Sequence, residues 1–180
     1  MLNITIPATE LFNENTYEFV TLPEVTLTLE HSLLAISKWE SKWEKPFLDK
    51  EEKTTDELYD YFRCMTVKPN VPPETYQRLT TAQIKQITDY INAPMTATTF
   101  ATNRHEKPSR EIITSELIYY WMTASQIPFE TEKWHINRLL TLIRICGIKN
   151  GKPDKMSKKD IYAQNRALNA ARRAKYGTKG

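Results

Sequence analysis

Residues 25–45, VTLTLEHSLLAISKWESKWEK, contain both kinds of hydrophobic periodicity that occur in this chain. In the first part every second residue is apolar, which is typical of a β-strand with one buried face. From Ser32 onward the apolar residues recur at helical spacing instead: Leu33, Ile36, Trp39 and Trp43. Because Pro46 cannot continue a helix, we expect this helix to end near Lys45. The stretch therefore predicts a strand followed directly by a helix.

Two more segments near the N-terminus alternate in the same way, at residues 2–6 and 17–19. Turn-forming residues separate them, with Asn13 to Asn15 on one side and Pro23 on the other. We therefore expect three short strands that share one buried face. A sheet of this size is marginal alone, so helices must pack on its apolar side.

Two capping boxes predict the start of further helices, since Thr54 precedes Glu57 and Thr80 precedes Gln83. Apolar residues at helical spacing extend the first helix to about residue 65 and the second to about residue 91. A short helical turn is expected between them, at residues 74–79. Ser109 is the expected cap of a strongly apolar helix that ends before Pro128, and its partner helix is expected to run from Phe129 to a C-terminal cap at Gly147. We expect this last pair of helices to form the centre of the core.

After Gly147 the composition changes to Lys, Gly, Pro and Asp, which indicates an exposed linker up to about residue 156. Ser157 and Asp160 then open an alanine-rich helix over residues 161–175. The charge changes with the composition. Residues 149–180 contain ten basic and two acidic side chains, whereas the other 148 residues contain 15 basic and 20 acidic ones.

The sequence thus predicts an α+β fold, mostly α, with a small N-terminal antiparallel β-sheet packed on a helical core. The basic C-terminal helix follows on a linker. Residues 1–30 are expected to form an N-terminal β-meander, residues 31–148 the helical core, and residues 149–180 the basic linker and helix that make contact with a partner. The longest apolar run, at residues 117–122, is too short to span a membrane, and the opening residues resemble no signal peptide.

Several kinds of chemistry lack their usual residues. All four glycines lie at or after position 147, so phosphate-binding loops and hydrolase elbows have no place in the core. Cys64 and Cys146 have no metal-ligand spacing, and we interpret them as buried thiols of a reducing compartment. We therefore expect no catalytic residue, no metal site and no cofactor.

Other polar residues also favour structural roles. We interpret His31 and His135 as hydrogen-bonded structural imidazoles, and His105 as a solvated residue of a polar loop. The acidic pairs Glu40 with Glu44 and Asp56 with Asp60 have helical spacing, and we interpret them as solvated charged faces. The four tryptophans are expected in the core.

The basic C-terminal segment leaves three interpretations open. It can be a solvated tail, which is the usual state of terminal segments. It can bind nucleic acid through its positive charge, although the acidic body would repel the same polyanion. It can also be a helix that docks into a groove on a protein, with Ile161, Leu168 and the alanines as anchors and the arginines at the rim. We favour the third and predict these partner-binding residues: Lys158, Lys159, Ile161, Tyr162, Arg166, Leu168, Arg172, Arg173 and Tyr176.

Four strings in the sequence resemble a known family: LTLEHSLLAISKWESKWEKPFL (27–48), ELIYYWM (116–122), KWHINRLLTLIRIC (133–146) and MSKKDIYAQNRALNAARRAKYGTKG (156–180). The chain is similar along nearly its whole length to the tail assembly chaperones of tailed bacteriophages. The resemblance implies a non-catalytic protein of the host cell cytoplasm. It would bind the tape-measure protein and the tail-tube protein while the tail assembles.

Two other functions remain open. The protein can be a structural component of the virion, in the tail or the head-to-tail connection, that docks to neighbouring subunits by its C-terminal helix. It can also be a nucleic-acid-binding protein that acts through its basic tail. Homo-oligomers are compatible with either protein-binding role, and no membrane partner is expected.

Overall fold

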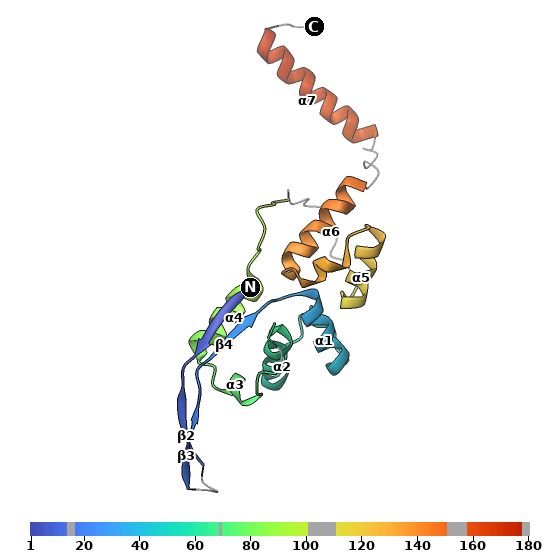
Figure 1. Ribbon diagram of the computed structural model, residues 1–180. Coiled ribbons are helices and arrows are strands. Elements are labelled where there is room, and N and C mark those ends of the chain that lie inside the picture. The colour runs from blue at the N-terminus through green and yellow to red at the C-terminus, as the bar shows by residue number, and fades with distance from the viewer. Residues whose placement is uncertain (14–16, 69, 101–110, 151–157, 178–180) are drawn as a thin grey trace. The chain divides into compact units, whose positions relative to one another are not determined.

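A computed structural model describes residues 1–13, 17–68, 70–100, 111–150 and 158–177 of the chain (Figure 1). The chain divides into two compact units, Met1–Gly147 and Ile148–Gly180. The first unit contains four strands and most of the helices. The fold class predicted from the sequence is confirmed: the protein is α+β and mostly helical, with a small antiparallel sheet at its N-terminus.

The N-terminal strands form one long hairpin. β1 (Leu2–Ile6) pairs antiparallel with β4 (Val25–Leu29), and β2 (Thr9–Asn13) pairs antiparallel with β3 (Glu18–Leu22). The register is the same in both halves, because Ile6 lies opposite Val25 and Thr9 lies opposite Leu22. Pro7 and Pro23 lie between the halves, and proline has no N–H to donate to a ladder. The two prolines therefore interrupt a single hairpin without shifting it, and we call its outer half, strands β2 and β3, the β-arm.

Arg78 forms hydrogen bonds to both strands at the prolines between the two halves of the hairpin. Its Nη1 and Nη2 both donate to the carbonyl oxygen of Pro23 at 3.3 Å, and Nη2 also donates to the carbonyl oxygen of Pro7. One guanidinium fork thus supplies hydrogen-bond donors at the place where the prolines cannot. The residue joins the base of the β-arm to the helical part of the first unit.

The predicted three-stranded meander is wrong in its pairing. Residues 17–19 were expected to form a strand with a buried face, but Tyr17 and Phe19 are 81% and 72% exposed. Asn13 to Asn15 and Pro23 had been interpreted as two separate turns. Pro23 instead lies within a hairpin whose pairing resumes on its other side. The buried face exists only in β1 and β4, where Ile4, Ile6, Leu27 and Leu29 enter the core.

Four helices of the first unit begin at a side-chain cap that is local in sequence. Ser32 caps the first helix through the amide of Ala35, and the capping boxes predicted at Thr54 and Thr80 are both present. The caps were predictable because each one needs only four consecutive residues. The helices are α1 (Leu33–Trp43), α2 (Thr55–Met65), α3 (Glu74–Gln77), α4 (Thr81–Asn92), α5 (Ser115–Ala124), the 3-10 helix η1 (Phe129–Lys133) and α6 (Ile136–Asn150).

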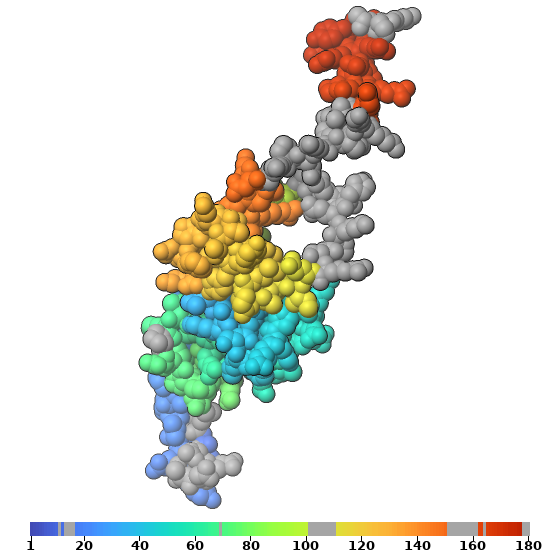
Figure 2. All heavy atoms as spheres, turned by 90° about the vertical axis from the view of Figure 1, so that its right-hand side faces the viewer, coloured from blue at the N-terminus to red at the C-terminus, as the bar shows by residue number. Residues whose placement is uncertain are grey.

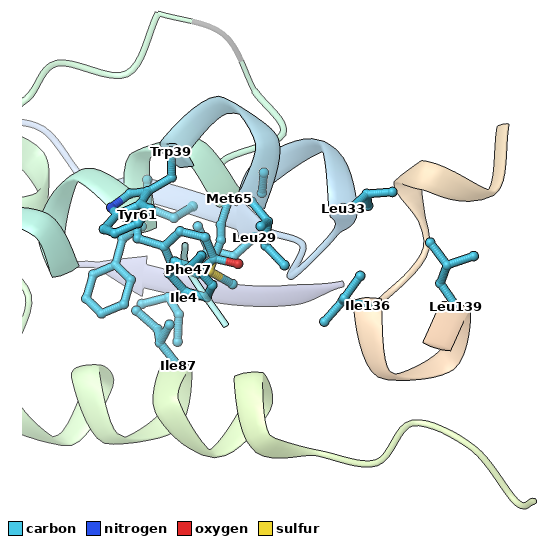
Figure 3. Packing of buried hydrophobic residues seen from close by; sticks show 14 of the residues in the cluster. Ile4, Leu29, Leu33, Trp39, Phe47, Tyr61, Met65, Ile87, Ile136 and Leu139 are labelled. Atoms are coloured by element: carbon cyan, nitrogen blue, oxygen red, sulfur yellow. The ribbon is translucent and has the colours of Figure 1, made fainter. Parts of the chain in front are cut away.

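The core lies where β1 and β4 meet α1 and α2 (Figure 3). Its largest fully buried side chains come from these elements and from α4 and α5, and α6 adds the buried Ile136 and Leu139. Phe47, from the segment after α1, stacks on Tyr61 of α2 with a centroid distance of 3.9 Å. The prediction that α5 and α6 form the centre of the core is therefore wrong. Although the sequence of α5 is strongly apolar, only two of its hydrophobic residues are buried, Ile118 and Met122.

The boundaries of α5 and α6 also differ from those predicted. The cap of α5 is Thr114, so the helix begins later than expected, and Ser109 lies outside the described residues. Phe129 belongs to the 3-10 helix η1 and not to α6. Gly147 does not end α6, which continues to Asn150, and a Cβ at Gly147 would meet no atom within 4 Å. Nothing at this position requires the conformational freedom of glycine.

The second unit contains α7 (Lys158–Tyr176), the longest helix of the described chain. Gly177 follows it with a φ of +64°, the left-handed conformation that glycine adopts readily at helix ends. Arg173 and Lys175 lie in the last turn, where positive charge interacts favourably with the helix dipole.

Candidate protein-interaction surface

Helix α7 contains every residue that the sequence predicted for partner binding. The side chains of Lys158, Lys159 and Ile161 lie outside the described part of the chain. The other six side chains are exposed: Tyr162, Arg166, Leu168, Arg172, Arg173 and Tyr176. Tyr162 and Tyr176 are 73% and 69% exposed, so their rings are available for contact.

Helical geometry divides these six residues between two faces. Tyr162, Arg166, Arg173 and Tyr176 follow one another at spacings of four, seven and three, which places them along one face of the helix. We call these four residues the Tyr–Arg face. Leu168 and Arg172 are four residues apart and lie on a different face. The predicted set is therefore only partly brought together.

A stripe of alanines runs beside the Tyr–Arg face, formed by Ala163, Ala167, Ala170 and Ala174. The helix surface is concave where the stripe meets Tyr162 and Arg166. Leu168 lies roughly a third of a turn away from the stripe. Ala171, three residues after Leu168 and four after Ala167, lies between Leu168 and the stripe. Small side chains flanked by guanidinium groups allow an apolar group to approach the helix closely while acidic groups pair at the edge.

The β-arm has exposed aromatic side chains, two of which, Tyr17 and Phe19, were expected on a buried face. Phe12, Tyr17 and Phe19 are 49%, 81% and 72% exposed. Alternation predicts a strand but does not say whether a helix covers it. A signal was nevertheless present in the sequence, because no Lys or Arg precedes Lys38 and the segment contains five glutamates.

Two carboxylates that we interpreted as solvated are buried. Glu40 of α1 is 7% exposed, and its two oxygens accept hydrogen bonds from the amides of Phe47 at 2.8 Å and Ser115 at 2.7 Å. Asp60 of α2 is 9% exposed. The periodicity of α1 and α2 could not reveal these positions, since the groups that pair with them come from other segments. Glu44 and Asp56, the other members of each pair, are exposed as predicted.

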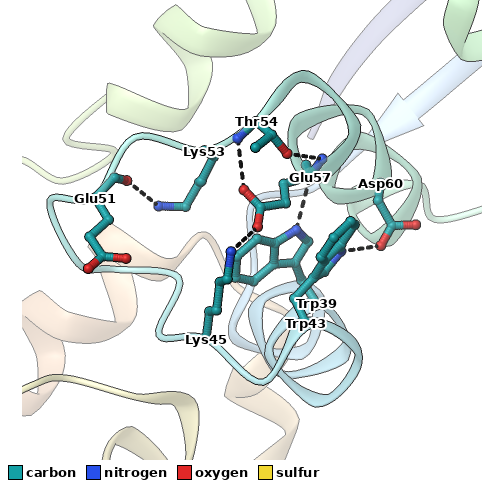
Figure 4. A network of polar contacts seen from close by, with 8 residues as sticks. All are labelled: Trp39, Trp43, Lys45, Glu51, Lys53, Thr54, Glu57 and Asp60. Atoms are coloured by element: carbon teal, nitrogen blue, oxygen red, sulfur yellow. Dashed lines mark hydrogen bonds and ion pairs between the residues drawn. The ribbon is translucent and has the colours of Figure 1, made fainter.

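Asp60 accepts hydrogen bonds from two side chains and forms an ion pair with a third. Trp43 Nε1 donates at 2.9 Å (Figure 4) and Lys42 Nζ donates at 2.7 Å, and the ion pair with Arg63 measures 2.7 Å. Burial raises the pKa of Asp60, but these donors outweigh it and hold the pKa below its ordinary value. In the same network Lys45 and the amide of Thr54 donate to Glu57, which lowers the pKa of Glu57. These carboxylates join α1 and the segment that follows it to α2.

The structure brings together two histidines that are far apart in sequence. The rings of His31 and His135 lie 5.0 Å apart between centroids, and both are buried. His31 Nδ1 bonds to the hydroxyl of Tyr61. The amide of Asn137 donates to His135 Nδ1 at 3.3 Å, so Nε2 carries the proton and donates to the Tyr90 carbonyl at 3.0 Å. Burial, with a smaller contribution from His135, lowers the pKa of His31 to about 3.

Other kinds of site are not found in the described part of the chain. No group of three or more His, Cys, Asp or Glu side chains among the described residues is placed to hold a metal ion. None of the described helices combines the length and the hydropathy needed to cross a bilayer. Cys64 and Cys146 are free thiols, each partly buried.

Comparison with known proteins gives no match. No protein-family model, no curated protein and no solved structure is similar to this chain. The function must therefore be argued from the surfaces of the protein and from the sequence strings themselves.

Proposed function

We propose that the protein is a non-catalytic assembly factor that binds partner proteins through the Tyr–Arg face of α7. The observation that carries this proposal is the exposure of that face on a helix outside the first unit. None of the buried core residues comes from α7. Since packing supplies most of the stability of a helix, an exposed helix with tyrosine and arginine on one face gains most from binding a partner.

The specific role that we propose is that of a bacteriophage tail assembly chaperone. Its partners are then the tape-measure protein and the tail-tube protein, and it acts in the cytoplasm of the host cell. The resemblance of the strings at 27–48, 116–122, 133–146 and 156–180 supports this role. A long tape-measure protein exposes apolar helices before the tube forms, and a helix that offers arginine beside alanine suits such a partner.

The test is co-expression of the protein with the tape-measure protein of the same phage. We compare Tyr162→Ala/Arg173→Ala, which removes a ring and a charge from the Tyr–Arg face, with Leu168→Ala/Arg172→Ala, which removes an apolar side chain and a charge from the other face. We expect the first variant to bind about tenfold more weakly or worse, as is usual for loss of an interface tyrosine and arginine. The second should bind nearly as the wild type. Equal binding by both variants would contradict the proposal.

Permanent incorporation into the virion is the competing role, and α7 supports it equally, since a virion subunit also needs an exposed helix to reach its neighbour. Mass spectrometry of purified virions separates the two. Many copies per particle would show that the protein is a structural subunit of the virion and not a chaperone. A gel shift that disappears in Arg166→Ala/Arg173→Ala and at high salt would favour nucleic acid as the partner instead.

A further inference from the structure

The β-arm extends beyond the described helices of the first unit (Figures 1 and 2). Phe12 and Phe19 lie opposite each other in the ladder, with ring centroids 5.2 Å apart. Tyr17 meets Phe12 edge to face at 6.3 Å. The three rings thus pack on one another while about half or more of each remains exposed. An apolar cluster held in this way is ordered before any partner arrives, which lowers the entropic cost of binding.

The exposed cluster continues the core face of the same hairpin. The register is unbroken across the prolines, so side chains two residues apart remain on one side of the ribbon. Ile4 and Ile6 on β1 are buried, and Phe12 lies on the same side further along. The helices of the first unit cover this face as far as Ile6. Beyond that point the same face is aromatic and uncovered, which is the usual mark of a binding surface.

The charge of the β-arm limits what can cover it. Glu10 and Glu18 lie on its strands, Glu24 follows β3, and all three are exposed. No Lys or Arg occurs before Lys38, and Arg78 contacts the β-arm at its base, away from the aromatic rings. The occupant must therefore offer an apolar surface that accepts aromatic rings, with positive charge beside it.

Helix α7 has these properties. Its alanine stripe provides a smooth apolar surface, its concavity lies between that stripe and Tyr162, and Arg166 and Arg173 flank it. Between Lys158 and Tyr176 there are six basic residues and one acidic residue. The aromatic rings of the β-arm fit against alanine, and Glu10, which lies on the same side of the ribbon as Phe12, is available to pair with the arginines.

We propose that the β-arm of one copy binds α7 of a second copy of this chain. The two surfaces are different, so the contact is heterologous, and an open assembly keeps a free β-arm at one end and a free α7 at the other. The protein then forms head-to-tail chains or rings. This inference goes beyond the proposed function: both contacts use Arg166 and Arg173 of α7, so self-assembly competes with the binding of another protein at this helix.

The experiment uses full-length protein and two variants that remove one surface each. Phe12→Ser/Phe19→Ser disables the β-arm and leaves α7 intact, whereas Arg166→Glu/Arg173→Glu disables α7 and leaves the β-arm intact. All four positions are exposed, so circular dichroism should show unchanged folding. Light scattering after size exclusion should show concentration-dependent assembly of the wild type, weakened by salt, and monomers of 21.1 kDa for each variant.

The decisive step is to mix the two variants in equal amounts. One offers only a working α7 and the other only a working β-arm, so we expect dimers that contain one copy of each and grow no further. Glu10→Lys/Glu18→Lys, which keeps the aromatic rings, should be monomeric alone and should assemble again when mixed with Arg166→Glu/Arg173→Glu. A wild type that is monomeric at every concentration, variants that assemble like the wild type, or mixtures that remain monomeric would each overturn the proposal.

Discussion

At the scale of single residues, the buried carboxylate of Glu40 joins three segments of the first unit. Its side chain extends from α1 and accepts two hydrogen bonds. One comes from the amide of Phe47, in the segment after α1, and the other from the amide of Ser115, at the start of α5. The first amides of a helix have no partner within it, and a carboxylate there also interacts favourably with the helix dipole. A single side chain of α1 therefore completes the cap of α5.

We predict that Glu40→Gln lowers the free energy of unfolding by about 2 kcal/mol, the usual value of hydrogen bonds to a charged group. The amide that replaces the carboxylate can accept at only one end and turns an N–H toward the other donor. Glu44→Gln, one turn later and exposed, is the matched control and should change stability by less than about 0.5 kcal/mol. Urea denaturation of both variants measures the difference, and equal effects would remove this role of Glu40.

The histidine pair predicts how stability depends on pH. Unfolded histidine has a pKa of about 6.5, whereas folded His31 has a pKa of about 3, and burial also lowers the pKa of His135. Between these values the unfolded state binds more protons, so acid favours unfolding. We expect the free energy of unfolding to fall by up to about 1.4 kcal/mol per pH unit for His31 as the pH is lowered from 6.5.

Chemical denaturation at several pH values between 5 and 6.5 measures this slope, since carboxylates such as Asp60 titrate mainly below that range. His31→Gln should have a smaller slope whatever its absolute stability. A variant with the slope of the wild type would show that other groups cause the acid sensitivity.

At the scale of elements, the base of the β-arm depends on Arg78. We predict that Arg78→Ala speeds amide hydrogen exchange in β2 and β3 without changing it in α2, because the carbonyls of Pro7 and Pro23 lose their donors. Arg78→Lys should behave similarly, since one ammonium group cannot reproduce the guanidinium fork. The exposed Lys85 of α4 provides the control as Lys85→Ala. Unchanged exchange in the β-arm of Arg78→Ala would mean that the hairpin is stable without this joint.

The sequence predicted elements where the deciding contacts are local and failed where they are distant. The capping boxes at Thr54 and Thr80 are complete within four residues, and both form. The pairing of β1 with β4 was not predicted because Pro23 is typical of a turn. Only the residues on the opposite strand show that it lies within a hairpin. Glu40 appeared solvated because its partner Ser115 lies 75 positions away.

The candidate surface was predictable in composition but not in arrangement. Charge and alanine content identify α7, and helical spacing then separates the Tyr–Arg face from Leu168. The β-arm was missed for a physical reason. A strand pattern with alternating apolar residues is identical whether helices cover it, as at Ile4, or leave it exposed, as at Phe19.

At the scale of the whole molecule, the two units predict separable stability. None of the buried core residues lies beyond α6, so a chain ending at Asn150 should keep its melting temperature within about 2 °C. Circular dichroism on heating measures this, and the helical signal should fall only by the contribution of the missing segment. A decrease of more than about 5 °C would mean that α7 stabilises the first unit.

The unbroken register of the hairpin also limits how the β-arm can vary in length. One residue added to each strand would advance its end by about 3.4 Å and turn the aromatic rings to the opposite side of the ribbon. Two residues added to each strand would advance it by about 7 Å and restore the original side. The reach of the β-arm can therefore change only in steps of about 7 Å. In a head-to-tail assembly the distance between successive copies would change with the length of the β-arm.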